Sequence, residues 1–103
     1  MKDRKKILNL LSLAQRAGKI ASGEFLTGKA VKSGSAYLVV IAADASDNTK
    51  KKFKNMCAFY HVPVIELSDR DVLGHSIGRE LRSSLAVMDD GFAKAVLKAC
   101  EAI

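Results

Sequence analysis

The segment GEFLTGKA, residues 23–30, has the spacing of a phosphate-binding loop. Gly23, Gly28 and Lys29 satisfy the pattern G-x-x-x-x-G-K, whose backbone N–H groups and lysine bind nucleotide phosphates. The full motif continues with Ser or Thr, because a hydroxyl at that position ligates Mg²⁺, whereas Ala30 follows here. Two interpretations are open at this point: a degenerate nucleotide site, or a helix start with similar letters.

The flanking sequence favours a helix start. A phosphate-binding loop has to follow a buried strand, whereas residues 3–17 carry apolar side chains at helical spacing and only residues 19–21 intervene. Ser22 is a good helix N-cap, and the helix formers after Gly23 predict that residues 24–27 are already helical. A helix there leaves no loop to wrap around phosphates, so we expect no nucleotide hydrolysis.

No other pattern predicts catalysis or metal binding. VVIAAD, residues 39–44, mimics the apolar strand whose Asp holds Mg²⁺ in P-loop enzymes, but a buried strand followed by a capping acid explains it. His61 and His75 are isolated in the sequence. Cys57 and Cys100 are far apart and have no histidine at ligand spacing, so we expect them to be small apolar side chains of helices. The sequence therefore predicts no enzyme, no metal and no cofactor.

The composition is that of a basic, folded protein. Of its 103 residues, 49% are hydrophobic and 27% are charged, which is typical of one globular domain over residues 1–103. There are 17 Lys and Arg against 11 Asp and Glu, a net charge of +6, and such an excess favours a polyanionic partner. No apolar run approaches the roughly 20 residues of a membrane helix, and no secretory leader is recognisable, so we expect no membrane partner and a cytoplasmic location.

The apolar periodicity predicts helices that alternate with strands. Helices are expected over 3–17, from Ser22 to about Lys32, from the caps in 44–48 through Phe53, Met56, Cys57 and Tyr60, from Ser68 or Asp69 to near Gly74–Gly78, and from Asp89 or Asp90 through Phe92, Val96, Leu97 and Cys100. Strands are expected around Ile20 and over 37–43, 62–67 and 84–88. This alternation in a short chain predicts an α/β fold, an α/β/α sandwich around one small sheet.

The start of the helix predicted after Ser22 offers groups that suit RNA. If Ser22 caps this helix, the free N–H groups of Gly23 and its neighbours carry partial positive charge, and the missing side chain of Gly23 lets an RNA backbone approach. Lys29 and Lys32 extend the positive surface along the helix, and Lys19 flanks it on the N-terminal side.

A second candidate surface combines one turn with one strand-end loop. The turn contains Ile77, Gly78, Arg79, Glu80, Leu81 and Arg82, and the loop contains Asp44. Two arginines among exposed apolar side chains suit an unstacked base packed on an aliphatic side chain while charge holds the phosphate. The alternative is an ordinary turn with solvated arginines. Both segments are expected at the same end of the sandwich.

Several segments carry a family resemblance. They are the helix-opening glycine with a lysine six residues later, SGSAYLVVIAADAS, FYHVPVIEL, LGHSIGRELRSSLAV and the closing DDGFA, in this order. Over about residues 5–100 the chain resembles the kink-turn RNA-binding ribosomal-protein superfamily, the L-seven-Ae and L-thirty-e group, and especially its short bacterial branch of YlxQ-type proteins. Gly23, Lys29 and Asp44 match that family's glycine, lysine and strand-end acid. The resemblance implies a four-stranded mixed sheet, and RNA binding at the second helix start and the loop before the last strand.

Two positions depart from the family pattern. In the family's kink-turn binders, an Asn-Glu pair near this helix start reads the edges of guanines in sheared G·A pairs. Phe25 and Leu26 stand at those positions and offer no hydrogen-bonding group, and Glu24 lies one residue earlier, which turns a helical side chain by about 100°. We therefore expect a monomeric, non-catalytic, ribosomal-protein-like protein that binds structured RNA, with a protein-interaction module on the same fold as the alternative.

Overall fold

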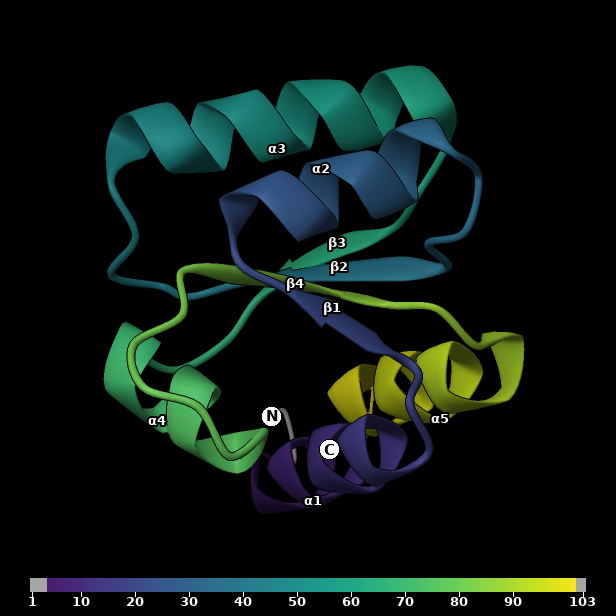
Figure 1. Ribbon diagram of the computed structural model, residues 1–103, viewed down its shortest axis with the longest axis vertical. Coiled ribbons are helices and arrows are strands. Elements are labelled where there is room, and N and C mark those ends of the chain that lie inside the picture. Colours follow the sequence, from purple (N-terminus) through teal and green to yellow (C-terminus); the bar gives the residue numbers. More distant parts are fainter. Residues whose placement is uncertain (1–3, 102–103) are drawn as a thin grey trace.

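A four-stranded sheet lies between two layers of helices in the computed structural model, which describes residues 4–101 (Figure 1). Its strands, in the sheet order β1-β4-β2-β3, are β1 (Ile20–Ser22), β4 (Ser84–Val87), β2 (Leu38–Ile41) and β3 (Val64–Glu66). β4 is antiparallel to β1 and β2, whereas β2 and β3 are parallel, so the sheet is mixed. The predicted α/β/α sandwich around a four-stranded mixed sheet is confirmed.

The helices divide into two groups, one on each face of the sheet (Figure 1). The helices α2 (Glu24–Lys32) and α3 (Asp47–Tyr60) cover one face, and the other face is covered by α1 (Arg4–Arg16), α4 (Arg70–Ser76) and α5 (Asp90–Glu101). The helix predicted from residue 3 is confirmed from Arg4 onward, and residue 3 lies outside the described residues. Within residues 4–101 no helix is long and apolar enough to cross a membrane.

The two central strands form the core because both of their faces are covered. Every residue of β2 and β4 is buried, and for β2 this confirms the buried strand predicted from its apolar run. Side chains from helices on both faces pack against them, among them Ile7, Leu11, Phe53, Leu73 and Val96. Cys57 is also buried in this core, which confirms its prediction as an apolar helix residue.

Three helices begin at side-chain caps that the sequence indicated. Ser46 accepts a hydrogen bond from the N–H of Thr49 at 3.2 Å and caps α3. Asp69 accepts one from Val72 at 2.8 Å, and Asp89 accepts one from Phe92 at 2.9 Å. Each cap satisfies one of the N–H groups that a helix start leaves without an intrahelical acceptor.

Candidate nucleic-acid interface

The start of α2 differs from the prediction in its cap. Ser22 is the last residue of β1, and the cap position is Gly23, which has φ 92° and makes no side-chain cap hydrogen bond. The prediction of Ser22 as the N-cap is therefore wrong, because the pairing of β1 with β4 fixes Ser22 as a strand residue. Gly23 is suited to this junction, since a positive φ strains residues that carry a Cβ.

The N–H of Gly23 is not free, which corrects a second expectation. It donates to the carbonyl of Ser84 at 3.0 Å and so continues the pairing of β1 with β4. The first bond within α2 runs from the Thr27 N–H to the Gly23 carbonyl at 3.0 Å. The N–H groups of residues 24–26 therefore have no acceptor within their own helix, and an uncapped helix start of this kind can accept a phosphate.

Residues 24–28 lie within α2, so the chain has no loop between Gly23 and Lys29. This confirms the prediction that residues 24–27 are helical and removes the geometry that a phosphate-wrapping loop requires. Ala30 is buried in the core, where a metal-ligating hydroxyl would have no role. Among the residues that the structure describes, no group of three or more His, Cys, Asp and Glu side chains could hold a metal ion.

The α4–β4 loop (residues 77–83) packs directly against α4 at Gly74. A Cβ on Gly74 would collide with the carbonyl oxygen of Glu80 and would lie 3.2 Å from the amide nitrogen of Arg82. The loop is fixed there by hydrogen bonds from the N–H of Arg79 to the Gly74 carbonyl, 2.9 Å, and from the N–H of Arg82 to the Arg70 carbonyl, 3.0 Å. Gly74 was not among the predicted site residues, because the sequence places it near the end of the predicted helix and gives no local signal that a loop approaches it there.

The α4–β4 loop is also joined to the start of α2. The Nε of Arg82 donates a hydrogen bond to the Oγ of Ser22 at 3.2 Å. Beneath this contact, the buried hydroxyl of Ser84 donates to the buried hydroxyl of Thr27 at 3.3 Å. The two surfaces predicted separately from the sequence therefore form one continuous interface, which we call the α2–loop interface (residues 22–26 and 77–83).

Exposure within the loop is uneven. Ile77 is only 3% exposed and belongs to the core, so the expectation that it is exposed to RNA is wrong. It is buried because it follows the last residue of α4 and turns into the core there. Leu81 is 56% exposed and is the apolar side chain that the loop presents to solvent. A hollow of about 620 Å³ lies beside it, lined by His75, Gly78, Arg79, Glu80 and Arg82.

Asp44 lies in the turn after β2, at the end of the sheet where α4 begins. Its carboxylate accepts a hydrogen bond from the N–H of Arg70 at 2.9 Å and forms an ion pair with the Nε of Arg70 at 3.5 Å. The carbonyl of Arg70 in turn accepts from the N–H of Arg82. The loop after β2 and the α4–β4 loop therefore gather at one end of the sandwich, as expected, and Asp44 acts there by positioning Arg70.

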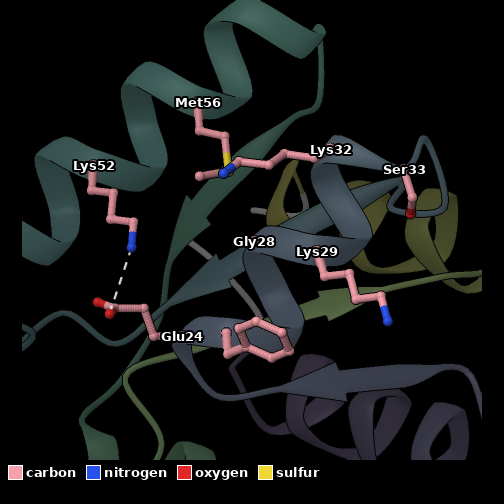
Figure 2. Close-up of a pocket in the computed structure, with 8 residues that line it drawn as sticks. Glu24, Gly28, Lys29, Lys32, Ser33, Lys52 and Met56 are labelled. Carbon is pink, nitrogen blue, oxygen red and sulfur yellow. Dashed lines mark ion pairs between the residues drawn. The ribbon is translucent and has the colours of Figure 1, made fainter.

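The predicted lysines occupy two separate places. Lys29 and Lys32 are exposed on α2 (Figure 2). Lys19 is exposed at the other end of β1, where its carbonyl accepts from the N–H of Met88 just after β4. Because Gly23 pairs with the opposite end of β4, the structure does not bring Lys19 to the α2–loop interface.

Glu24 is directed toward α3. Its carboxylate lies 3.5 Å from the Nζ of Lys52, and Figure 2 shows the two side chains extending toward each other. Lys52 was not predicted as a site residue, since only the packing of α3 beside α2 shows which of its lysines faces this helix. The two helices border a groove of about 470 Å³ whose lining includes Phe25 and Met56.

Two of the described residues, both outside the α2–loop interface, have shifted pKa values. Burial raises the pKa of the Cys57 thiol from 9.0 to about 11, so the thiol stays protonated well above neutral pH. Hydrogen bonds from Lys54 and Lys50 lower the pKa of Glu66 below its usual value. Glu66 thus ties β3 to α3 as a carboxylate, through ion pairs of the kind that contribute modestly at a surface.

The chain is similar to known proteins over nearly its whole length. RNA-binding protein YlxQ of Bacillus subtilis (strain 168) is 47% identical over 88 residues, which cover 85% of this chain and 88% of that protein. RNA-binding protein YlxQ of Enterococcus faecium is 42% identical over 92 residues, covering 89% of this chain and 88% of that protein. The resemblance to the YlxQ-type branch is thereby confirmed.

Solved structures share the fold. A protein of unknown function from Bacillus halodurans has a TM-score of 0.91 and 37% identity, with 94% of this chain and 98% of that chain covered. The Giardia lamblia 15.5kD RNA binding protein has a TM-score of 0.80 at 24% identity, with 94% and 83% covered, and shows the fold alone. Residues 5–97 match the ribosomal protein L7Ae/L30e/S12e/Gadd45 family. The chain therefore belongs to the ribosomal protein L7Ae/L30e/S12e/Gadd45 family.

Proposed function

We propose that this protein is a non-catalytic RNA-binding protein that binds structured RNA through the α2–loop interface. The observation that carries the proposal is the junction of the uncapped start of α2 with the arginine-bearing loop, made by the hydrogen bond from Arg82 to Ser22. Family membership, relatives named as RNA-binding proteins and the net charge of +6 all support it.

Each part of the α2–loop interface has a role in this proposal, and Lys29 and Lys32 extend the binding surface from it along α2. The N–H groups at the start of α2 and the ammonium groups of Lys29 and Lys32 bind RNA phosphates, and Gly23 leaves room for the RNA backbone. Arg79 contacts phosphate from the other side, while Leu81 packs against an unstacked base. Arg82 is partly engaged by Ser22 and therefore mainly positions the loop.

A binding assay with labelled RNA tests the proposal. The probes are a hairpin that contains a kink-turn, a hairpin with an uninterrupted stem of the same length, and a single strand of the same composition. We expect binding of a folded RNA that weakens steeply with salt, by a log–log slope of about 0.9 for each duplex phosphate contact. Lys29→Ala should lower the affinity severalfold and reduce that slope by about one.

Lys98→Ala is the matched control for the Lys29 variant. Lys98 is also an exposed helical lysine, but it lies on α5, on the opposite face of the sheet (Figure 1). Both substitutions remove one positive charge, so a long-range effect of net charge would lower affinity equally. Equal effects of the two variants, or binding that is independent of salt, would contradict the proposed interface.

A protein-interaction module is the second candidate function, and one observation favours it. Phe25 and Leu26 are 78% and 49% exposed at the start of α2, and exposed apolar side chains are typical of protein contacts. Purification of the tagged protein with and without nuclease distinguishes the two functions. Two results together would favour this second function. A stoichiometric protein partner remains bound after nuclease treatment, and no RNA is recovered from the purification without nuclease.

The remaining expectations are part of the same proposal. We propose that the protein acts as a monomer and as one domain over residues 1–103, in the cytoplasm, where ribosomal and other structured RNAs are available. Light scattering during size-exclusion chromatography measures the oligomeric state directly. A dimer that persists at all concentrations would contradict the proposed monomer. The part of the α2–loop interface that the second copy leaves accessible would then have to be determined.

A further inference from the structure

The groove between α2 and α3 is a second candidate site, adjacent to the α2–loop interface. Gly28 of α2 and Met56 of α3 lie together in this groove, and a Cβ on Gly28 would lie 3.8 Å from the Cε of Met56 (Figure 2). The groove has a volume of about 470 Å³ and a mainly apolar lining. Sites for small ligands have volumes of about 300–1,000 Å³, so one nucleotide fits this space.

The charges around the groove are mostly positive. Lys29, Lys32 and Lys52 line it together with one acid, Glu24. Glu24 and Lys52 form an ion pair at 3.5 Å, with 59% and 49% of their side chains exposed. An exposed pair at this distance is weak and is screened by salt, so an incoming phosphate can displace the carboxylate from Lys52.

We propose that the α2–α3 groove binds one unpaired nucleotide of the RNA that the α2–loop interface holds. The base lies on Met56 and Phe25, and the adjacent phosphates contact Lys32 and Lys52, with Lys52 released from Glu24. The inference rests on the proposed function, because Phe25 lies both in the α2–loop interface and in the lining of the groove. Glu24 then acts as a competitor of RNA phosphate and not as a reader of bases.

The chemistry of the groove suits an RNA strand better than a free nucleotide. Apolar and aromatic side chains stack on bases without regard to sequence, while lysines along a groove follow a continuous phosphate backbone. Lys32 is in the last turn of α2, whereas Lys52 faces its first residue, so the lysines flank the groove at both ends of α2. In an RNA strand each nucleotide has a phosphate on either side, so the strand can contact Lys32 and Lys52 at once. A nucleoside monophosphate has one phosphate and can contact only one of them.

Crosslinking tests where RNA lies on the protein. The probe is the tightest-binding RNA of the three tested above, prepared with 4-thiouridine in its unpaired positions, and crosslinked peptides are identified by mass spectrometry. We expect crosslinks at Phe25 and Met56 in addition to the α4–β4 loop. Crosslinks confined to the loop and the α2 start, with none at Met56, would overturn the inference while leaving the proposed function intact.

Charge variants test the competition between Glu24 and phosphate. We expect Glu24→Gln to tighten RNA binding about two- to fivefold, whereas Asp90→Asn, at the first residue of α5 and paired with Lys94 on the opposite face, changes it less than twofold. Lys52→Gln should weaken binding about three- to tenfold and lower the salt slope by about 0.7, the value for one single-strand phosphate contact. Lys51→Gln, an exposed neighbour on α3, should change it less than twofold.

The outcomes separate this inference from the proposed function. Glu24→Gln and Lys52→Gln indistinguishable from their controls, with Lys29→Ala still weakening binding, would overturn the groove and keep the α2–loop interface. If Lys29→Ala also binds RNA no more weakly than its control Lys98→Ala, both the groove and the α2–loop interface are overturned. Uridine monophosphate that competes with the RNA at equal concentration would show a mononucleotide site and would likewise overturn the RNA-strand inference. Circular dichroism of each variant verifies that its fold is retained.

Discussion

Arg82 and Ser22 are 60 residues apart in the chain, yet the Nε of Arg82 donates a hydrogen bond to the Oγ of Ser22 at 3.2 Å. The contact joins the last residue of β1 to the loop that leads into β4. Because β1 and β4 are already paired, the bond extends sheet pairing into the side chains of the α2–loop interface. It thereby fixes how the start of α2 and the loop lie relative to each other.

The first prediction concerns this bond. Ser22→Ala should lower the free energy of unfolding by about 0.5–1.5 kcal/mol, since the bond is partly exposed and Arg82 can bond to water in its place. Arg82→Lys keeps the charge but loses both the Nε donor to Ser22 and the Nη1 donor to the Leu81 carbonyl, so its effect on stability and RNA affinity should equal or exceed that of Ser22→Ala. Urea unfolding of both single variants and the double variant measures the coupling. Additive effects would show that the two residues act independently.

The second prediction compares two helical glycines. Gly74→Ala should lower the free energy of unfolding by about 1–3 kcal/mol and weaken RNA binding, because the new methyl group collides with Glu80 and displaces the loop. Gly28→Ala should instead raise stability by about 0.5–1 kcal/mol, since its Cβ meets Met56 at an ordinary 3.8 Å and alanine favours the helix. Urea denaturation and the RNA titration measure both. Similar effects of the two substitutions would contradict the close approach at Gly74.

The elements of the fold could be predicted because their signals are local. The apolar run at 37–43 and the apolar spacing from Phe53 to Tyr60 depend only on neighbouring residues, and both elements were found. The ends were less predictable. β2 stops at Ile41, before the turn at residues 43–44, and β3 begins only at Val64, after Pro63, which has no N–H to donate.

The interface was predictable only in outline, since its details depend on contacts between distant segments. Ser22 looks like a helix cap in the sequence, but its pairing with β4 makes it a strand residue, and its hydroxyl accepts a hydrogen bond from Arg82. Ile77 looks like a turn residue, but packing on the core buries it. Nothing local distinguishes Lys52 from the other lysines of α3, because the position of α2 decides which one meets Glu24.

The third prediction uses the Cys57 thiol as a probe of core packing. Its pKa of about 11 lies above the ordinary 9.0 because burial penalises the thiolate. The stability that this difference contributes is fully present below about pH 9 and is lost as the pH rises toward 11, since the unfolded chain releases the proton first. Cys57→Ala should therefore lose less stability than the wild type over this interval. Parallel stability curves would show that the native thiol ionises as readily as the unfolded one.

Iodoacetamide provides an independent measurement of the same thiol. At pH 8 we expect Cys57 to be unmodified in the native protein and modified after unfolding in urea, because the reagent attacks the thiolate. Peptide mapping assigns the modified residue. Rapid native labelling of Cys57 would contradict its burial on the core-facing side of α3.

The fourth prediction concerns the specificity set by Phe25 and Leu26. Both side chains are exposed and apolar, so in the proposed interface they would make none of the hydrogen bonds that an Asn-Glu pair would make to guanine edges. We expect the wild type to prefer a kink-turn hairpin over an uninterrupted hairpin by less than about tenfold, or about 1.4 kcal/mol, which is near the lower end of the roughly 1–3 kcal/mol that one good bidentate base contact supplies. Phe25→Asn combined with Leu26→Glu should increase this preference while leaving stability nearly unchanged, because neither side chain is part of the core.

A control for charge completes this test, because Leu26→Glu also adds a negative charge beside the RNA. Leu26→Glu alone should weaken binding to both hairpins equally, whereas the double variant should weaken binding to the uninterrupted hairpin and retain binding to the kink-turn. A double variant that loses both hairpins equally would show that α2 of this chain is not placed to read sheared G·A pairs. Phe25 and Leu26 would then mark a different target geometry, with bases held by stacking and not by their edges.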